Sequence, residues 1–217
     1  SKIFPPSELI INEDGTIFHL HLAPEQLADK VILVGDPGRV DLVASYFDET
    51  ECKVENREFR TITGTYNGKR ISVVSTGIGC DNIDIVHVCT VKSIGFDGLL
   101  NFYAGRNKVC DLDLEAAFIR HMGWTGNQCI AHPYVINAHQ ELADRIAGSD
   151  MVRGITIAAG GFYGPQGREL RIPLADPQQN QKIEQFAFNN LRITNFEMES
   201  SAVAGLSCLL GHRATTV

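Results

Sequence analysis

The stretch Val31-Ile32-Leu33-Val34-Gly35-Asp36-Pro37-Gly38-Arg39 decides the fold class of this chain. Its apolar beginning, Val31 to Val34, is a short continuous run of the kind found in strands buried within a sheet. Asp36 is a favourable helix N-cap and Pro37 a favourable first helical residue, so a helix is expected to run from there to about Phe47. A buried strand that passes through a glycine turn into a helix is typical of α/β proteins.

Strand and helix signals continue to alternate along the rest of the chain. The turn signal Asn67-Gly68 predicts a hairpin between strands at Arg60 to Tyr66 and Lys69 to Ser75. Further strands are expected at Arg153 to Ala159 and Leu191 to Thr194. Helices are expected at Asp111 to Met122, His139 to Ala147, from Asp176-Pro177 onward, and Met198 to Leu210. In the first of these helices, one face carries Leu112, Ala116, Ile119 and Met122. This order predicts an α/β fold with three αβα layers, in which helices flank a central mixed β-sheet in a single domain, residues 1–217.

Composition narrows the classes of function. Of 217 residues, 44% are hydrophobic and 21% charged, and the net charge is −7 with no basic stripe. We therefore expect neither a nucleic-acid nor a membrane partner, because both need clustered cations. The N-terminus lacks a signal pattern, and no apolar run approaches the ~20 residues of a membrane span. Scattered cysteines and histidines, without CxxC or HExxH spacing, predict a cytoplasmic protein with no metal and no cofactor.

The turn Gly35 to Arg39 is the first candidate for chemistry. Free N–H groups and the positive end of the following helix favour an anion there, and Arg39 can bind two phosphate oxygens with its forked guanidinium. The alternative is a plain strand-to-helix turn with a surface arginine, and these five residues alone favour that alternative.

The loop 162–168 is the second candidate, because ligands of α/β proteins bind after the carboxyl ends of strands. Phe162 offers an aromatic face, and the Gln166 amide has a donor and an acceptor that match the edge of a uracil ring. Arg168 can neutralise charge on a departing base. The alternative is a surface loop with solvated Gln and Arg side chains, and the glycines do not decide between the two.

The segment Asn195-Phe196-Glu197-Met198-Glu199-Ser200 is the third candidate. Two carboxylates at a strand end can bind a ribose diol through charge-assisted hydrogen bonds. The commoner use of such residues is as acids of the first helical turn, where the helix dipole favours them.

Taken together and in this order, these segments resemble the hexameric-type purine and uridine nucleoside phosphorylase family. Val34 to Val40 resembles its phosphate-binding turn, and Ser75-Thr76-Gly77-Ile78-Gly79 its glycine loop. Phe162-Tyr163 with Gln166 and Arg168 is similar to the pocket of the uridine phosphorylase branch. Phe18-His19-Leu20 and Asn56-Arg57-Glu58-Phe59 also match. The resemblance implies phosphate-dependent cleavage of a pyrimidine nucleoside, as in pyrimidine salvage and catabolism.

The resemblance also implies roles for individual residues. It assigns phosphate to Gly35, Arg39 and Arg57, ribose to His19, Glu197, Met198 and Glu199, and the base to Phe162, Gln166 and Arg168, with Arg39, Arg168 and Glu199 as the catalytic residues. In the family the His and Arg corresponding to His19 and Arg57 act in a neighbouring subunit, which implies self-association with a dimer as the minimal unit and a hexamer as the family assembly. Inorganic phosphate would be the co-substrate. In some relatives a monovalent cation lies near the position of Glu58, and the sequence leaves its presence open, as it does the choice among uridine, thymidine and deoxyuridine.

The chain departs from the family after the glycine loop. The family continues into an Arg-x-Gly-Thr-Thr/Ser-Gly segment that holds phosphate, which is absent here, and the stretch His87 to Ser93 matches no expected element. Too few residues separate Gly79 from Gly95 for a parallel crossover, which takes roughly 30 residues or more. The chain also stops where the family has a further strand, a lid region and a last helix. Either the numbering runs across a missing segment near 87–94, which the intact flanking motifs favour, or this is a shortened member.

Three other functions stay open at this point. A nucleosidase would use water in place of phosphate, and a purine nucleoside phosphorylase would prefer inosine. A non-catalytic nucleoside-binding protein would bind uridine without cleaving it.

Overall fold

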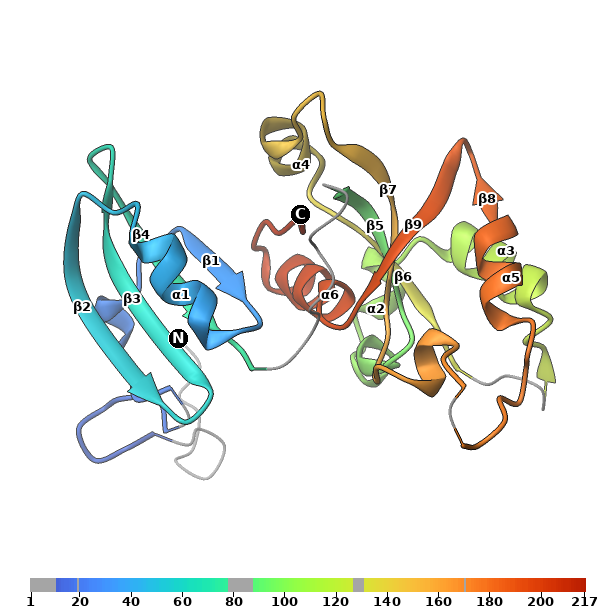
Figure 1. Ribbon diagram of the computed structural model, residues 1–217, viewed down its shortest axis with the longest axis horizontal. Coiled ribbons are helices and arrows are strands. Elements are labelled where there is room, and N and C mark those ends of the chain that lie inside the picture. The colour runs from blue at the N-terminus through green and yellow to red at the C-terminus, as the bar shows by residue number, and fades with distance from the viewer. Residues whose placement is uncertain (1–10, 19, 78–87, 127–130, 170) are drawn as a thin grey trace. The chain divides into compact units, whose positions relative to one another are not determined.

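The computed structural model of the chain describes residues 11–18, 20–77, 88–126, 131–169 and 171–217 (Figure 1). The chain divides into two compact units, Ser1–Gly79 and Cys80–Val217, each with its own sheet and core. No helix within the described ranges is long and apolar enough to cross a membrane. The single domain expected for residues 1–217 stays a prediction.

The first unit is built on a four-stranded mixed sheet. It contains β1 (Val31–Val34), β2 (Glu49–Asn56), β3 (Phe59–Tyr66) and β4 (Lys69–Ser75), in the order β1-β4-β3-β2. β1 runs parallel to β4, and the other neighbours are antiparallel. Asn67 and Gly68 have φ values of 48° and 69°, as a two-residue hairpin turn with two positive φ angles requires. The hairpin predicted from Asn67-Gly68 is therefore confirmed.

Helix α1 (Pro37–Ala44) packs against β3 and β4 and follows β1 through the predicted turn. The Asp36 carboxylate accepts a hydrogen bond from Gly38 N (2.8 Å), so Asp36 is the N-cap expected from the sequence. The helix ends at Ala44, before the predicted Phe47, which instead packs on the core beside α1. The expectation that Val31 to Val34 is buried is wrong: Val31, Ile32 and Leu33 are 38–48% exposed, because β1 is an edge strand.

The second unit is built on a five-stranded mixed sheet. Its strands are β5 (Val88–Gly95), β6 (Tyr134–Asn137), β7 (Val152–Ala158), β8 (Ala187–Phe188) and β9 (Leu191–Glu197), in the order β6-β5-β7-β9-β8. The central strands β5, β7 and β9 are parallel, and the two outer strands are antiparallel to their neighbours. The carboxyl ends of the central strands therefore meet at one edge of the sheet.

Helices cover both faces of this sheet (Figure 1). They are α2 (Arg106–Val109), α3 (Leu112–Met122), α4 (Gln140–Ile146), α5 (Gln179–Gln185) and α6 (Ser200–Leu210), with 3-10 turns at Pro24–Gln26 in the first unit and at Leu99–Phe102 and Gly164–Gln166 in this one. α6 lies against one face, and α3 and α5 lie together on the other. Between α3, α5 and the sheet is an apolar core in which Phe118 makes edge-on ring contacts with Trp124 and Phe186.

The predicted α/β class is confirmed, with helices flanking mixed sheets, although the strands are divided between two sheets. The segment that matched no expected element is largely β5, at the centre of the second sheet; residues 78–87 lie outside the described residues. The predicted apolar face of α3 is wrong in part, because Leu114, Phe118 and Met122 are its buried residues and Leu112 is 45% exposed.

Candidate active site

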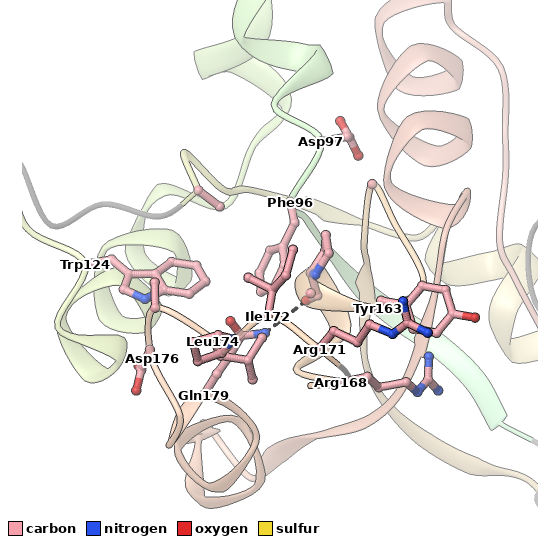
Figure 2. Close-up of a pocket in the computed structure, with 16 residues that line it drawn as sticks. Phe96, Asp97, Trp124, Tyr163, Arg168, Arg171, Ile172, Leu174, Asp176 and Gln179 are labelled. Atoms are coloured by element: carbon pink, nitrogen blue, oxygen red, sulfur yellow. Dashed lines mark hydrogen bonds between the residues drawn. The ribbon is translucent and has the colours of Figure 1, made fainter.

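A cavity of about 1200 Å³ lies in the second unit, beyond the carboxyl ends of β5 and β7. Figure 2 shows Trp124 at one end, Tyr163 and Arg168 at the other, and Phe96 and Ile172 between them. The walls come from the segments that follow the two strands, from the end of α3 and from the stretch that leads into α5; the lining residues are Phe96, Asp97, Trp124, Ala131, Gly160, Tyr163, Gly164, Pro165, Arg168, Arg171, Ile172, Pro173, Leu174, Ala175, Asp176 and Gln179. A large, mainly apolar cavity with a few polar groups is the usual form of a small-molecule site.

Arg168 is held at one end of the cavity by its own loop. Its Nη1 donates to the backbone oxygen of Phe162 (2.6 Å) and to Gln166 Oε1 (2.7 Å). The guanidinium carbon lies 3.8 Å from the centroid of the Phe162 ring, which is a cation–π contact. This face of Phe162 is therefore covered by Arg168 and not open to a heterocycle.

Gln166 is buried beneath this guanidinium, with 4% of its surface exposed. Its Oε1 accepts from Arg168, while its Nε2 has no hydrogen-bond partner among the described residues. A buried amide donor without a partner costs about 1–3 kcal/mol, so such groups are often completed by a ligand. Together, Gln166 and Arg168 offer one amide donor and one guanidinium to a ligand whose edge carries several hydrogen-bond acceptors.

Glu197 is the last residue of β9, and its carboxylate is turned onto the start of α6. Its Oε2 accepts from the backbone N of Glu199 (2.8 Å) and of Ser200 (2.6 Å), and Oε1 accepts from Ser200 Oγ (2.5 Å). Burial raises the pKa of Glu197, and these hydrogen bonds partly oppose that rise. Glu197 therefore acts as an acid at the start of a helix, which is the commoner use of such residues and the alternative left open by the sequence.

Glu199 lies two residues further on and is half-buried. No ion pair or side-chain hydrogen bond holds its carboxylate among the described residues, in contrast to Glu197. Burial raises the pKa of Glu199, the nearby charge of Glu197 raises it further, and the backbone N–H of Met198 opposes this rise. Glu199 therefore keeps its acceptor oxygens available for a ligand, whereas Glu197 does not.

A polar cluster joins β5 to the start of α6 near the cavity. Asp97 Oδ2 accepts from Ser201 Oγ (2.8 Å), and the Tyr134 hydroxyl donates to Ser201 Oγ (3.0 Å). Burial raises the pKa of the Tyr134 phenol. Gly95 lies so close to this cluster that an added Cβ would be 2.5 Å from the Tyr134 ring and 2.8 Å from Ser201 Oγ. The cluster ties the first turn of α6, and with it Glu199, to the strand below.

The proposed phosphate residues belong to the first unit. Gly35 precedes the Asp36 cap, and Arg39 lies in the first turn of α1 without an ion pair among the described residues. Arg57 is exposed in the turn between β2 and β3, with φ at 57°, an uncommon value for a residue other than glycine. The Asp36 carboxylate already takes the Gly38 N–H, so the plain-turn alternative is partly realised.

Two further predictions concern the first unit. His19 lies outside the described residues. Glu58 is exposed and contributes its backbone oxygen to Ser75 Oγ (2.7 Å). Within the described ranges, no group of three or more His, Cys, Asp or Glu side chains could hold a metal ion.

The structure brings together two of the three predicted segments. Ala159 N donates to Glu197 O (2.7 Å), so loop 162–168 and the segment with Met198 and Glu199 leave the same edge of the sheet, from neighbouring strands. The meeting of Arg39 and Arg57 with these residues stays a prediction.

Sequence reasoning missed the other walls of the cavity. Phe96 and Asp97 follow β5, a strand that was not predicted, and Trp124 was not among the candidate site residues. Trp124 is buried, at 3% exposure, and it also lines the cavity. Segment 171–176 carried no signal for a site, although a helix was expected from Asp176 onward.

Comparisons with known proteins agree with this geometry. A family profile described as "Phosphorylase superfamily" matches residues 29–104. A uridine phosphorylase of Thermococcus kodakarensis is 33% identical over 99% of this chain and 80% of its own length. A DeoD-type purine nucleoside phosphorylase of Bacillus velezensis is 27% identical, over 92% and 84%. The crystal structure of a Trypanosoma brucei nucleoside phosphorylase, described as showing uridine phosphorylase activity, has a TM-score of 0.80 at 29% identity and covers 95% of this chain and 88% of that one.

Proposed function

Because this chain belongs to the phosphorylase superfamily, we propose that it cleaves uridine with inorganic phosphate, yielding uracil and ribose 1-phosphate. The relatives make it a pentosyltransferase, an enzyme of nucleoside phosphorolysis with phosphate as co-substrate. Uridine as the preferred nucleoside is supported by the uridine phosphorylases among the relatives and by the loop 162–168.

The observation that carries the choice of uracil is the Gln166–Arg168 pair. Uracil presents two carbonyl oxygens on either side of an N–H, and this edge matches a carboxamide combined with a guanidinium. The unpartnered Nε2 of Gln166 is a donor for one carbonyl, and Arg168 is a donor for another. Because the carboxamide is buried, base binding must turn the Gln166 side chain outward or open its turn.

Cytosine fits this pair less well. Its N3 carries no proton and its C4 carries an amino group, so it presents a donor where Arg168 also donates. Unpaired buried partners cost about 1–3 kcal/mol each, and a hydrogen-bonding site rejects such analogues strongly. Uridine is therefore expected to exceed cytidine clearly in kcat/KM.

The reaction needs three things from the protein: phosphate placed below C1′, a firmly held ribose, and stabilisation of the leaving base. A phosphate oxygen forms a bond to C1′ of the ribose while the bond from C1′ to N1 breaks, and the electron pair of that bond leaves with uracil. The sugar passes through a state with oxocarbenium character, as in glycoside cleavage. Arg168 stabilises the negative charge that develops on the base, and phosphate stabilises the sugar cation. Positioning the two reactants supplies up to about 7–11 kcal/mol of such a barrier in favourable cases.

The remaining roles follow the family resemblance, modified by the geometry. Glu199 and Met198 bind ribose, while Glu197 acts mainly by fixing the start of α6. Gly35, Arg39 and a neighbouring subunit's Arg57 hold phosphate, and His19 of that neighbour meets the 5′ end of the ribose. Phe162 contributes by stacking under Arg168. A dimer as the minimal unit, a hexameric assembly and a cation near Glu58 stay predictions.

The test is uracil release from uridine in the presence and absence of phosphate. Arg168→Ala and Gln166→Ala should each lower kcat/KM for uridine by about 100-fold, the scale of losing one donor to developing charge. Arg192→Ala is the matched control, since this exposed arginine of β9 does not line the cavity. Wild-type turnover by both pocket variants would contradict the assignment.

The same assay separates the rival functions. Release without phosphate would indicate a nucleosidase. Turnover of inosine but not uridine would favour the purine reaction, the one named for the B. velezensis relative. Uridine binding without turnover at any phosphate concentration would indicate a non-catalytic binding protein.

A further inference from the structure

Two side chains of α5 hold the loop 162–168 by its backbone. Asn180 Nδ2 donates to the carbonyl oxygens of Gln166 (3.1 Å) and Gly167 (3.4 Å). The neighbouring Gln179, which is 5% exposed, donates from Nε2 to Pro165 O (3.0 Å), the dashed line in Figure 2. Three consecutive carbonyls of the turn are therefore bound by two consecutive amides.

The contact with Asn180 leaves no room for a side chain at Gly167 unless Asn180 moves. Gly167 has φ at 70°, and a Cβ placed there would lie 2.2 Å from Asn180 Oδ1 and 2.5 Å from its Cγ. The glycine permits both the left-handed backbone and the approach of the amide. The loop conformation and the position of Asn180 are thus fitted to each other.

α5 is itself fixed in the second unit. Ile183 belongs to the apolar core, and Phe186 at the end of the helix meets the Phe118 ring edge-on at 5.1 Å. Lys182 forms an ion pair with Asp176 (2.6 Å), which lies just before the helix and also lines the cavity. One anchored helix therefore carries contacts to both the 162–168 loop and the 171–176 segment.

We propose that Gln179 and Asn180 are specificity-determining positioning residues of this enzyme. Their amide donors are used by the loop carbonyls. By holding the carbonyls of Pro165, Gln166 and Gly167, they set the turn from which the Gln166 amide and the Arg168 guanidinium read the base. This inference rests on the proposed function, and it extends the specificity site to α5, a helix whose part in the site neither the sequence nor the relatives' names indicated.

The decisive variant is Asn180→Asp, which keeps the side-chain size but replaces the donor by a carboxylate that repels both carbonyls. Gln181→Glu is the matched control, because it adds the same charge at the next, exposed position of α5. For Asn180→Asp we expect uridine kcat/KM to fall at least tenfold and the uridine-to-cytidine ratio to fall at least threefold. The KM for phosphate should change less than twofold. General damage to the fold would change this KM as well, so an unchanged value separates the two explanations. Gln179→Met, which removes the other donor at similar size, should shift the same ratio.

A second readout does not depend on activity. Trypsin cleavage after Arg168, followed by mass spectrometry, should be several-fold faster in Asn180→Asp than in Gln181→Glu, because the guanidinium is then less firmly held. Equal base ratios in Asn180→Asp and Gln181→Glu would overturn the positioning role. If the wild-type chain does not cleave uridine with phosphate, the proposed function fails, and equal trypsin rates in the two variants would then overturn the inference separately.

Discussion

Replacing Gly167 by alanine should destabilise the second unit, whereas the same change at Gly164, in the same turn, should not. Alanine at φ near +70° costs about 1–2 kcal/mol in backbone strain. The new Cβ would also displace Asn180, whose nearest atom lies only 2.2 Å away, and break its bond to Gln166 O, a loss of about 0.5–1.5 kcal/mol. The expected decrease in the free energy of unfolding is roughly 1.5–3.5 kcal/mol.

Calorimetry or thermal-shift fluorescence can measure this difference. At about 2–4 °C per kcal/mol for a unit of this size, Gly167→Ala should lower Tm by roughly 3–14 °C. Gly164 has no atom within 4 Å of its would-be Cβ and has no positive φ. Gly164→Ala should therefore stay within about 1 kcal/mol of the wild type, or gain slightly from a stiffer unfolded chain. Equal melting temperatures for the two variants would refute the argument from backbone conformation and close approach.

Two further predictions concern carboxylates. Burial and the charge of Glu197 raise the pKa of Glu199, so the folded state favours its protonated form, and the stabilisation that this gives at low pH is lost as the pH rises through the raised pKa. Glu199→Gln should therefore raise Tm relative to wild type at pH 7 and not at pH 4, while abolishing uridine turnover; a Tm gain that is the same at both values would contradict the proposed cause. In the first unit, Asp36→Ala should cost about 0.5–2 kcal/mol through loss of the N-cap, measured by urea unfolding, while Asp36→Asn, which keeps an acceptor for Gly38 N, should cost less than half as much.

Features set by local chemistry could be read from the sequence. The cap Asp36, the helix start at Asp111, the helix ends at Met122 and Leu210, and the Asn67-Gly68 turn are all where the residues predict them. Each depends on one to three neighbouring residues and on no distant partner. The loop 162–168 was found for a similar reason, since it follows a recognisable strand.

Features set by distant partners could not be read in this way. β5 and β6 are strands because they pair with each other, and the sequence around Val88 to Gly95 shows no clear alternation. The exposure of β1 follows from its place at a sheet edge. The cavity wall formed by Trp124 exists only because α3 ends beside the loop after β5. Such neighbours are assembled by topology, which one sequence without an alignment does not reveal.

The pair Glu197 and Glu199 shows how one short motif serves both stability and function. The Glu197 carboxylate accepts three hydrogen bonds from the start of α6, so its burial is compensated. Glu199 is half-buried beside that charge, and only the backbone N–H of Met198 opposes the resulting rise in its pKa, which is unfavourable for folding. Uncompensated groups persist mainly where a ligand completes them. A ribose diol supplies two hydroxyl donors to a carboxylate. Glu199, the destabilising residue of the pair, is therefore the one best suited to bind the sugar, and the buried Glu197 holds Glu199 in place.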